Sequence, residues 1–327
     1  MADPIAIGAL LTQGIRREFA LVYTPRYRGV MDRIGGVVWL EVTSDKISEL
    51  YGFLNAAIYP VRWDPGNEIG AKSILSVQFR TPNRDFGRRV YLPRNYEDDQ
   101  TGTVFAVARA LGTNWATLSE RIFYQVMTNA TDNDLLPVNP TSADGNALYL
   151  TSTRYGSSSG NVVSVTGTTI VQDVITDIFG VKRRLIEFQN TESQPFWDPT
   201  DIDRGLTIFH GSSLTLVMEQ AKSMIVTPLA ASTATSNAGI SNSLQNAGFV
   251  PNFVNSQRIT NSSYYCWLNG VDGPQRPLFR QVRKAMTEAQ GNWSTSDHTR
   301  DVGEQYVQFD SREGWGSPLA IATVRVS

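Results

Sequence analysis

A long amphipathic stripe constrains this chain more than any other feature of its 327 residues. Between Thr103 and Met127, apolar side chains recur every three or four residues, which is the period of an α-helix with one buried face. At a rise of 1.5 Å per residue the helix is roughly 38 Å long, more than twice the length of an average helix. Any fold that contains it must supply an apolar surface of matching length. The stripe consists of Val104, Val107, Leu111, Trp115, Leu118, Ile122 and Val126.

An arginine-rich segment precedes this helix. SILSVQFR and RRVYLPRNY alternate as strands do, and TPNRDFG between them has turn chemistry. Residues 70–96 are therefore predicted to form an extended two-stranded loop with its tip near residues 82–87. A two-stranded ribbon is at best marginally stable alone in water, so we expect this loop to become ordered by lying on another molecule. Its basic side chains are Arg80, Arg84, Arg88, Arg89 and Arg94.

Three consecutive acids, Glu97, Asp98 and Asp99, separate the loop from the helix. Carboxylates just before a helix N-terminus interact favourably with its partial positive charge, by roughly 0.3–1 kcal/mol each. A cation site or a catalytic pair is an alternative role for these acids, and a solvated acidic turn is the commoner outcome. For the arginines, phosphate binding is an alternative to contact with another protein, and the protein contact is favoured.

The remaining pattern alternates strands, helices and polar loops. Residues 1–40 are expected to form an extended or short-helical arm, with about two helical turns from Ala9 to Phe19. A helix is predicted from Ser44 to about Ala57, and loops from Asn129 to Gly167. Further helices are expected at 168–190 and 212–223, and strands at VVWLEV, LTIF, SSYYCWLNG, RPLFRQV, EQYVQFD and LAIATVRV, the last two separated by a SREGWGSP turn.

Charge and cysteine content exclude several classes of protein. With 29 basic and 31 acidic residues the net charge is −2, which argues against a dedicated nucleic-acid binder. A single cysteine, Cys266, excludes an internal disulfide and a cysteine-rich metal site. The N-terminus lacks the features of a signal peptide and no apolar run is long enough to span a membrane, so we expect a protein made inside a cell with no membrane partner.

Most of the short motifs that carry catalytic chemistry are missing from the sequence. It contains no P-loop, GxGxxG, HExxH or CxxC pattern. His210 and His298 each stand without a neighbouring nucleophile or metal ligand, so both are expected to be structural or exposed. Cys266 lies in an apolar strand whose aromatic side chains are predicted to be core rather than base-stacking groups. We therefore predict no enzymatic activity, no cofactor and no metal.

The order of the predicted elements resembles the α+β fold of the major capsid proteins of tailed bacteriophages, the HK-97-like fold. The resemblance implies an N-terminal arm at 1–40, a short helix and connection at 41–69, an extended loop (E-loop) at 70–96 and a spine helix with part of the P domain at 97–155. It further implies an A domain at 156–262 and closing P-domain and A-domain strands at 263–327.

Five short stretches are similar to the major head subunit of Mu-like phages, the gpT type. Together they cover about 15% of the chain in matching order, and the middle of the chain, 155–260, holds no recognised match. The stretches are SELYGFL at 48–54, NYEDDQTG at 95–102, ADGNALYLTST at 143–153, RPLFRQVRKAM at 276–286 and QYVQFDSREGWG at 305–316.

The resemblance implies a major capsid protein that assembles from many copies, as hexamers and pentamers, into an icosahedral or prolate shell around double-stranded DNA. The partners that it implies are scaffolding and portal proteins, decoration proteins and DNA, which is contacted non-specifically. The location that it implies is the virion capsid. The arginines of the loop and the acids after it are then expected to meet between subunits. The alternatives are an encapsulin-like nanocompartment shell, another virion protein such as a tail or decoration subunit, and a carbohydrate-active hydrolase.

Overall fold

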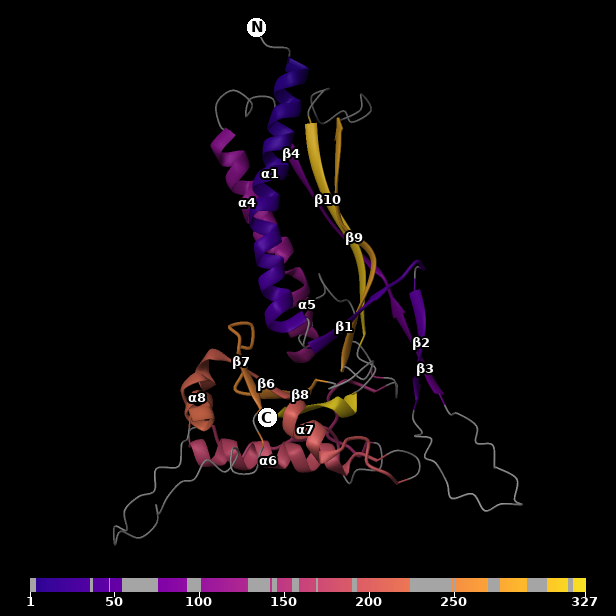
Figure 1. The fold of residues 1–327 in the computed structure, drawn as a ribbon, viewed down its shortest axis with the longest axis vertical. Coiled ribbons are helices and arrows are strands. Elements are labelled where there is room, and N and C mark those ends of the chain that lie inside the picture. The colour runs from indigo at the N-terminus through magenta and orange to yellow at the C-terminus, as the bar shows by residue number, and fades with distance from the viewer. Residues whose placement is uncertain are drawn as a thin grey trace, which may run out of the picture. The chain divides into compact units, whose positions relative to one another are not determined.

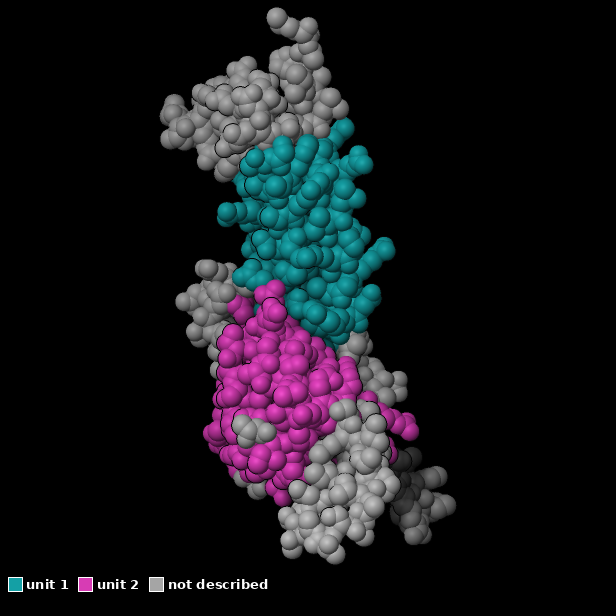
Figure 2. All heavy atoms as spheres, turned by 90° about the vertical axis from the view of Figure 1, so that its left-hand side faces the viewer, with its two compact units in different colours: residues 1–49, 81–123, 280–315 teal, residues 50–80, 124–279, 316–327 magenta. Residues whose placement is uncertain are grey.

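The computed structural model divides into two compact units, coloured separately in Figure 2. Unit 1 contains residues 1–49, 81–123 and 280–315, and unit 2 contains residues 50–80, 124–279 and 316–327. Each unit is described by itself. The structure describes residues 4–35, 38–46, 48–54, 76–92, 101–128, 142, 146–154, 159–168, 170–189, 193–223, 249, 251–269, 277–292, 305–316 and 320–327.

Unit 1 is a two-helix layer on one face of a four-stranded sheet (Figure 1). Helix α1 (Pro4–Val30) runs beside helix α4 (Thr101–Ala116), and a short π-helical turn, η1 (Met31–Gly35), follows α1. The sheet has the strand order β1-β9-β10-β4. Its strands are β1 (Trp39–Thr43), β9 (Leu278–Asn292), β10 (Gln305–Gly316) and β4 (Arg84–Leu92).

Helix α1 contacts both α4 and the sheet. The ring of Phe19 stacks on Phe309 of β10 with 4.1 Å between ring centroids. The backbone of Phe19 lies so close to α4 that a Cβ added to Gly112 would be 2.8 Å from the Phe19 carbonyl oxygen. Ile15 and Phe19 are buried together with Val104 of α4 and Val307 of β10. This small core joins the three elements.

The predicted long helix is confirmed, with a local irregularity at Thr117. Helix α5 (Leu118–Thr128) continues from α4, and the Thr117 N–H still donates to the Thr113 carbonyl at 3.3 Å. The Thr117 hydroxyl donates to the same carbonyl at 3.2 Å, a back-bond that commonly bends helices. The predicted stripe is wrong at Val107, which is 47% exposed, because the close approach of α1 buries Ala108 and Gly112 instead.

Unit 2 contains a five-stranded sheet in the order β5-β11-β8-β6-β7. Helix α6 (Val171–Glu187) packs on this sheet through Val174, Ile178 and Val181, which confirms the helix predicted at 168–190. The other elements of the unit are β5 (Val162–Val163), α7 (Pro199–Gly205), β6 (Leu206–His210), η2 (Ser212–Leu214), α8 (Thr215–Ser223), β7 (Asn252–Asn255), β8 (Tyr264–Leu268), η3 (Ala320–Ala322) and β11 (Thr323–Val326).

The prediction that β8 is a core strand is confirmed. Tyr264, Tyr265, Cys266 and Trp267 are each 0% exposed, and β8 lies between β11 and β6 in the sheet. Burial raises the pKa of the Cys266 thiol far above its usual range. Cys266 is therefore a buried apolar residue rather than a reactive group.

Three predictions of local structure are wrong. The helix expected from Ser44 to Ala57 is instead strand β2 (Ser48–Leu54), which pairs with β3 (Ser76–Pro82). Gly52 disfavours a helix by about 1 kcal/mol, and the aromatic residues beside it favour a strand, so pairing with a distant segment prevails. Residues 55–75 lie outside the described part of the chain.

The N-terminal helix is 27 residues long rather than two turns, and it continues through Pro25. Its length follows from packing on α4 and the sheet, which outweighs the helix-breaking tendency of proline. The expected SREGWGSP turn is also wrong, because β10 continues to Gly316 with Glu313 and Trp315 buried on its inner face.

The contact between α1 and α4 can be tested at Gly112. We expect Gly112→Ala to lower the free energy of unfolding by about 1–3 kcal/mol, because the new methyl group overlaps the Phe19 backbone. Gly102→Ala in the first turn of the same helix is the matched control, since an added Cβ there meets nothing within 4 Å. Chemical denaturation measures both, and equal unfolding midpoints would contradict the close contact.

Candidate functional site

The two strands of the predicted extended loop are present, but they do not pair with each other. Strand β3 pairs with β2, whereas β4 pairs antiparallel with β10 from Arg84 opposite Glu313 to Leu92 opposite Gln305. Only Asn83 separates β3 from β4, which is too short for a hairpin turn of at least two residues. The Asn83 amide donates to the Ser44 hydroxyl at 3.2 Å and to the Lys46 carbonyl at 2.6 Å. The prediction of a two-stranded ribbon that gains its shape only on another molecule is therefore wrong for β4.

Strand β4 forms one edge of the four-stranded sheet and carries most of the predicted arginines. Arg84, Arg88 and Arg89 are exposed on it, opposite Glu313, Phe309 and Gln308 respectively. Arg80 is exposed on β3, which pairs with β2 in a separate two-stranded sheet. The structure thus brings three of the five predicted arginines onto one strand. Arg94, Glu97, Asp98 and Asp99 lie outside the described residues, so their role stays a prediction.

The outer face of this sheet is covered by paired polar side chains. Arg89 donates to Gln308 at 2.6 Å, and Arg312 forms a two-pronged ion pair with Asp85, one contact being 2.9 Å. Lys284 donates to Asp310, a hydrogen bond that lowers the pKa of that carboxyl. These pairs are largely exposed, so each adds little to stability. Positive and negative groups alternate, and this face lacks the continuous basic patch that a nucleic-acid surface needs.

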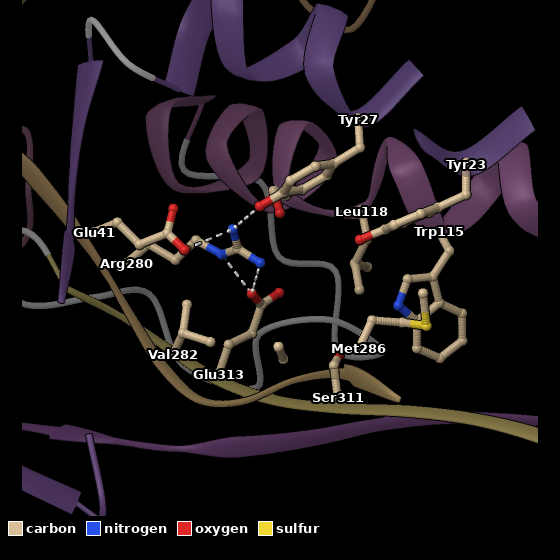
Figure 3. Close-up of a pocket in the computed structure, with 12 residues that line it drawn as sticks. Tyr23, Tyr27, Glu41, Trp115, Leu118, Arg280, Val282, Met286, Ser311 and Glu313 are labelled. Atoms are coloured by element: carbon tan, nitrogen blue, oxygen red, sulfur yellow. Dashed lines mark hydrogen bonds and ion pairs between the residues drawn. The ribbon is translucent and has the colours of Figure 1, made fainter. Parts of the chain in front are cut away.

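The inner face of the sheet holds a buried ion pair that sequence reasoning missed. Arg280 of β9 contacts Glu313 of β10 at 2.5 Å, and its guanidinium also donates to the Tyr27 hydroxyl of α1 at 2.7 Å (Figure 3). The Arg280 side chain is 10% exposed and that of Glu313 is 2% exposed. Tyr27 and Trp315 place their rings 5.9 and 5.8 Å from the guanidinium carbon, within cation–π range.

This environment keeps Arg280 charged. Burial by itself lowers the pKa of the Arg280 guanidinium, but Glu313, Tyr27 and Glu41 together raise it above its ordinary value. The sequence does contain a signal for this pair. In the period-two pattern of β10, Glu313 lies on the same face of the strand as the buried Phe309, Ser311 and Trp315. A charged residue on the apolar face of a strand requires a partner on the neighbouring strand.

Among the described residues, no group of three His, Cys, Asp or Glu side chains is placed to hold a metal. The structural role predicted for His210 is confirmed, because it is 1% exposed and contacts the Gly211 carbonyl at 3.1 Å, and burial lowers its pKa. His298 lies outside the described residues. None of the described helices is long and apolar enough to cross a bilayer.

Comparison with solved structures identifies the fold. The capsid of cyanophage P-SCSP1u superposes with a TM-score of 0.51 and 10% identity, covering 90% of this chain and 87% of that chain. The capsid of a native GTA particle gives 0.52 and 10%, covering 88% and 87%. The mature capsid of bacteriophage PhiM1 gives 0.50 and 10%, covering 89% and 84%. No protein-family model matches the sequence, and no curated protein matches it.

The chain therefore has the predicted α+β fold of phage major capsid proteins, the HK-97-like fold. At these identities the likeness defines the fold alone. The fold prediction, made from the order of the elements, is confirmed even though two segments of it, β2 and the ribbon, were assigned wrongly.

Breaking the buried ion pair should be costly. Arg280→Met leaves the Glu313 carboxylate buried without its main partner, so we expect the free energy of unfolding to fall by about 3–5 kcal/mol. The double variant Arg280→Met/Glu313→Met should recover most of that loss, because both charges are removed together.

Arg312→Met is the matched control, since Arg312 lies on the outer face of the same sheet and its pair with Asp85 is exposed. We expect the denaturant midpoint of this control variant to change little. A double variant as unstable as Arg280→Met would contradict the pairing.

Proposed function

We propose that this chain is the major capsid protein of a tailed bacteriophage, many copies of which form a closed shell around double-stranded DNA. The observation that supports it most is the similarity of nearly the whole chain, about nine-tenths of its length, to capsid subunits of comparable length. The chain acts as a structural component rather than as an enzyme, without a cofactor. It resides in the virion capsid after assembly in the host cytoplasm.

Within this class the gpT type of Mu-like phages is the proposed relative. Its support is the order of the five motifs from SELYGFL at 48–54 to QYVQFDSREGWG at 305–316. The long helix α4–α5 lies within 97–155, the proposed spine helix and P domain. Helix α6, strand β6 and helix α8 lie within the proposed A domain at 156–262, and the closing strands β8 and β11 complete its sheet.

Strand β4 is the proposed contact between copies. An edge strand has one row of backbone N–H and carbonyl groups that pair with nothing in its own sheet, so it is suited to meet a second molecule. Arg84 and Arg88 extend from it, and guanidinium groups suit paired contacts with carboxylates. The proposed acceptors are Glu97, Asp98 and Asp99 of the adjacent copy. Each exposed pair is weak, but a closed shell repeats it many times and still permits errors to dissociate.

Other partners follow from the same proposal. A scaffolding protein and a portal would direct assembly, decoration proteins would bind the finished shell, and DNA would be contacted without sequence preference. The near-neutral charge of −2 is consistent with a container for DNA rather than a high-affinity binder of it.

The size of the purified protein tests the proposal. We expect the expressed chain, alone or with a scaffolding protein from the same genome, to elute as a megadalton species and to show closed shells by negative-stain microscopy. A species of 36.2 kDa under all these conditions would contradict a shell protein. Particles that contain an enzyme instead of DNA when isolated from their natural source would favour a nanocompartment.

Charge reversal tests the proposed contact. We expect Arg88→Glu/Arg89→Glu to reduce shell formation severely while leaving the fold intact, because both side chains are exposed on the edge strand. Shell yield by sedimentation and secondary structure by circular dichroism measure the two effects.

The control Arg183→Glu/Arg258→Glu changes the net charge by the same amount at exposed positions of unit 2. Normal shells from the β4 variant, or equal loss from both variants, would refute a specific role for β4.

A further inference from the structure

A cavity of about 170 Å³, partly open to solvent, lies in unit 1 between the helix layer and the sheet. Figure 3 shows Tyr23 and Tyr27 of α1 on one side and Ser311 of β10 on the opposite side. Leu118, Trp115 and Met286 close the end away from Arg280. For comparison, a cavity of about 150 Å³ is large enough to hold benzene. The space therefore fits a small organic molecule.

One end of the cavity is acidic. Glu41 and Glu313 line it together with a single basic residue, Arg280, so acidic side chains exceed basic ones by one. Arg280 is already engaged, since it contacts Glu313 through Oε2, donates to the Tyr27 hydroxyl and lies 3.7 Å from Glu41. Arg280 thus pairs with both carboxylates, and its one positive charge balances only one of their two negative charges.

The decisive feature is the other oxygen of Glu313. Oε1 is buried and has no hydrogen-bond partner among the described residues. In Figure 3 it is the carboxylate oxygen without a dashed line, on the side of Glu313 that is nearer to Leu118 and Ser311. A buried carboxylate oxygen without a donor is costly, and a hydrogen-bond donor in the cavity would remove that cost.

The helix side and the far end of the cavity are aromatic. The rings of Tyr23 and Tyr27 are stacked along the helix side with 5.4 Å between centroids, and the Trp115 indole and the Met286 thioether lie at the end away from Arg280. Burial, together with the neighbouring Tyr27 hydroxyl and nearby carboxylates, raises the pKa of Tyr23 to about 12, so its hydroxyl is neutral at physiological pH. Aromatic faces beside an uncompensated acid attract organic cations.

We propose that this cavity binds an alkylammonium group of about the size of a lysine side chain. The ammonium would donate to Oε1 of Glu313, and its methylene chain would lie against Tyr23 and Trp115. Anions are disfavoured by the excess acid, and water alone would leave the aromatic end unused. A free amine and a lysine of a second copy share this chemistry. The proposal concerns a single folded chain, so it stands whether or not copies assemble into a shell.

Saturation-transfer NMR titration of the full-length chain with n-butylammonium chloride tests the proposal. We expect saturable binding, with n-butanol at least about tenfold weaker because it lacks the charge. Ser311→Leu, which fills the cavity from the sheet, should abolish binding. Glu41→Gln, at a partly exposed position, should weaken it about fivefold to tenfold without disturbing the Arg280–Glu313 pair.

Glu288→Gln is the matched control, because Glu288 is an exposed acid on β9 that does not line the cavity. It should bind as the unmodified chain does. Any one of three results would overturn the proposal. These are the absence of saturable binding, binding of n-butanol as tight as that of n-butylammonium, and unchanged n-butylammonium binding by the Ser311→Leu variant.

Assembled and unassembled fractions of the chain distinguish the two sources of the amine. Binding in both fractions would identify a site for a free amine. Binding in the unassembled fraction alone would indicate that a lysine of a second copy occupies the cavity after assembly.

Discussion

The packing of Phe19 determines the arrangement of unit 1. Its ring lies on Phe309 of β10, and its backbone lies against Gly112 of α4, so one residue of α1 contacts both other layers. Because Gly112 has no side chain, the two helices approach closely enough for the exposed Glu18–Arg109 pair to form beside them. In folded proteins most of the stability of a helix comes from tertiary packing rather than from its own propensity. Its 27 residues are therefore stabilised mainly by this contact, and the N-terminal region is part of the core of unit 1 rather than a free arm.

The sheet of unit 1 uses its charged residues in two different ways. On the outer face, Arg312 with Asp85 and Lys284 with Asp310 form exposed pairs that water and salt weaken. On the inner face, Arg280 and Glu313 are buried, so their pairing holds β9 and β10 in one relative position at a considerable desolvation cost. Substitutions in the outer pairs therefore cost less stability than substitutions in the inner pair. This difference explains why the inner pair constrains the fold more strongly than the outer pairs do.

The sequence pattern alone predicts an element correctly where the segment has its own hydrophobic period or apolar run. Helix α6 shows a complete amphipathic repeat, β8 is a continuous apolar run and β6 is mostly apolar, so each is predicted close to its observed bounds. The errors share one cause, which is a partner distant in sequence. Strand β2 pairs with β3, β4 pairs with β10 more than 200 residues later, and α1 is lengthened by α4. The Arg280–Glu313 pair joins positions 33 residues apart, and no local pattern specifies which acid a buried arginine will meet. The arginines of β4 were found by composition, but their place on a sheet edge required the pairing with β10.

The pairing of β4 with β10 changes how a contact between copies would form. A free ribbon would have to lose conformational entropy when it bound, and this cost would weaken the contact. Strand β4 is already ordered on its own chain, so Arg84, Arg88 and Arg89 are held at fixed spacing before any second molecule arrives. A preorganised edge of this kind makes even weak ion pairs effective, because little further ordering opposes them. The long, exposed edge also creates a risk of indiscriminate strand pairing, and its closely spaced like charges reduce that risk by repelling the same strand of another copy. The same arginines would thus favour the proposed acidic partner and disfavour the pairing of β4 with the β4 strand of another copy.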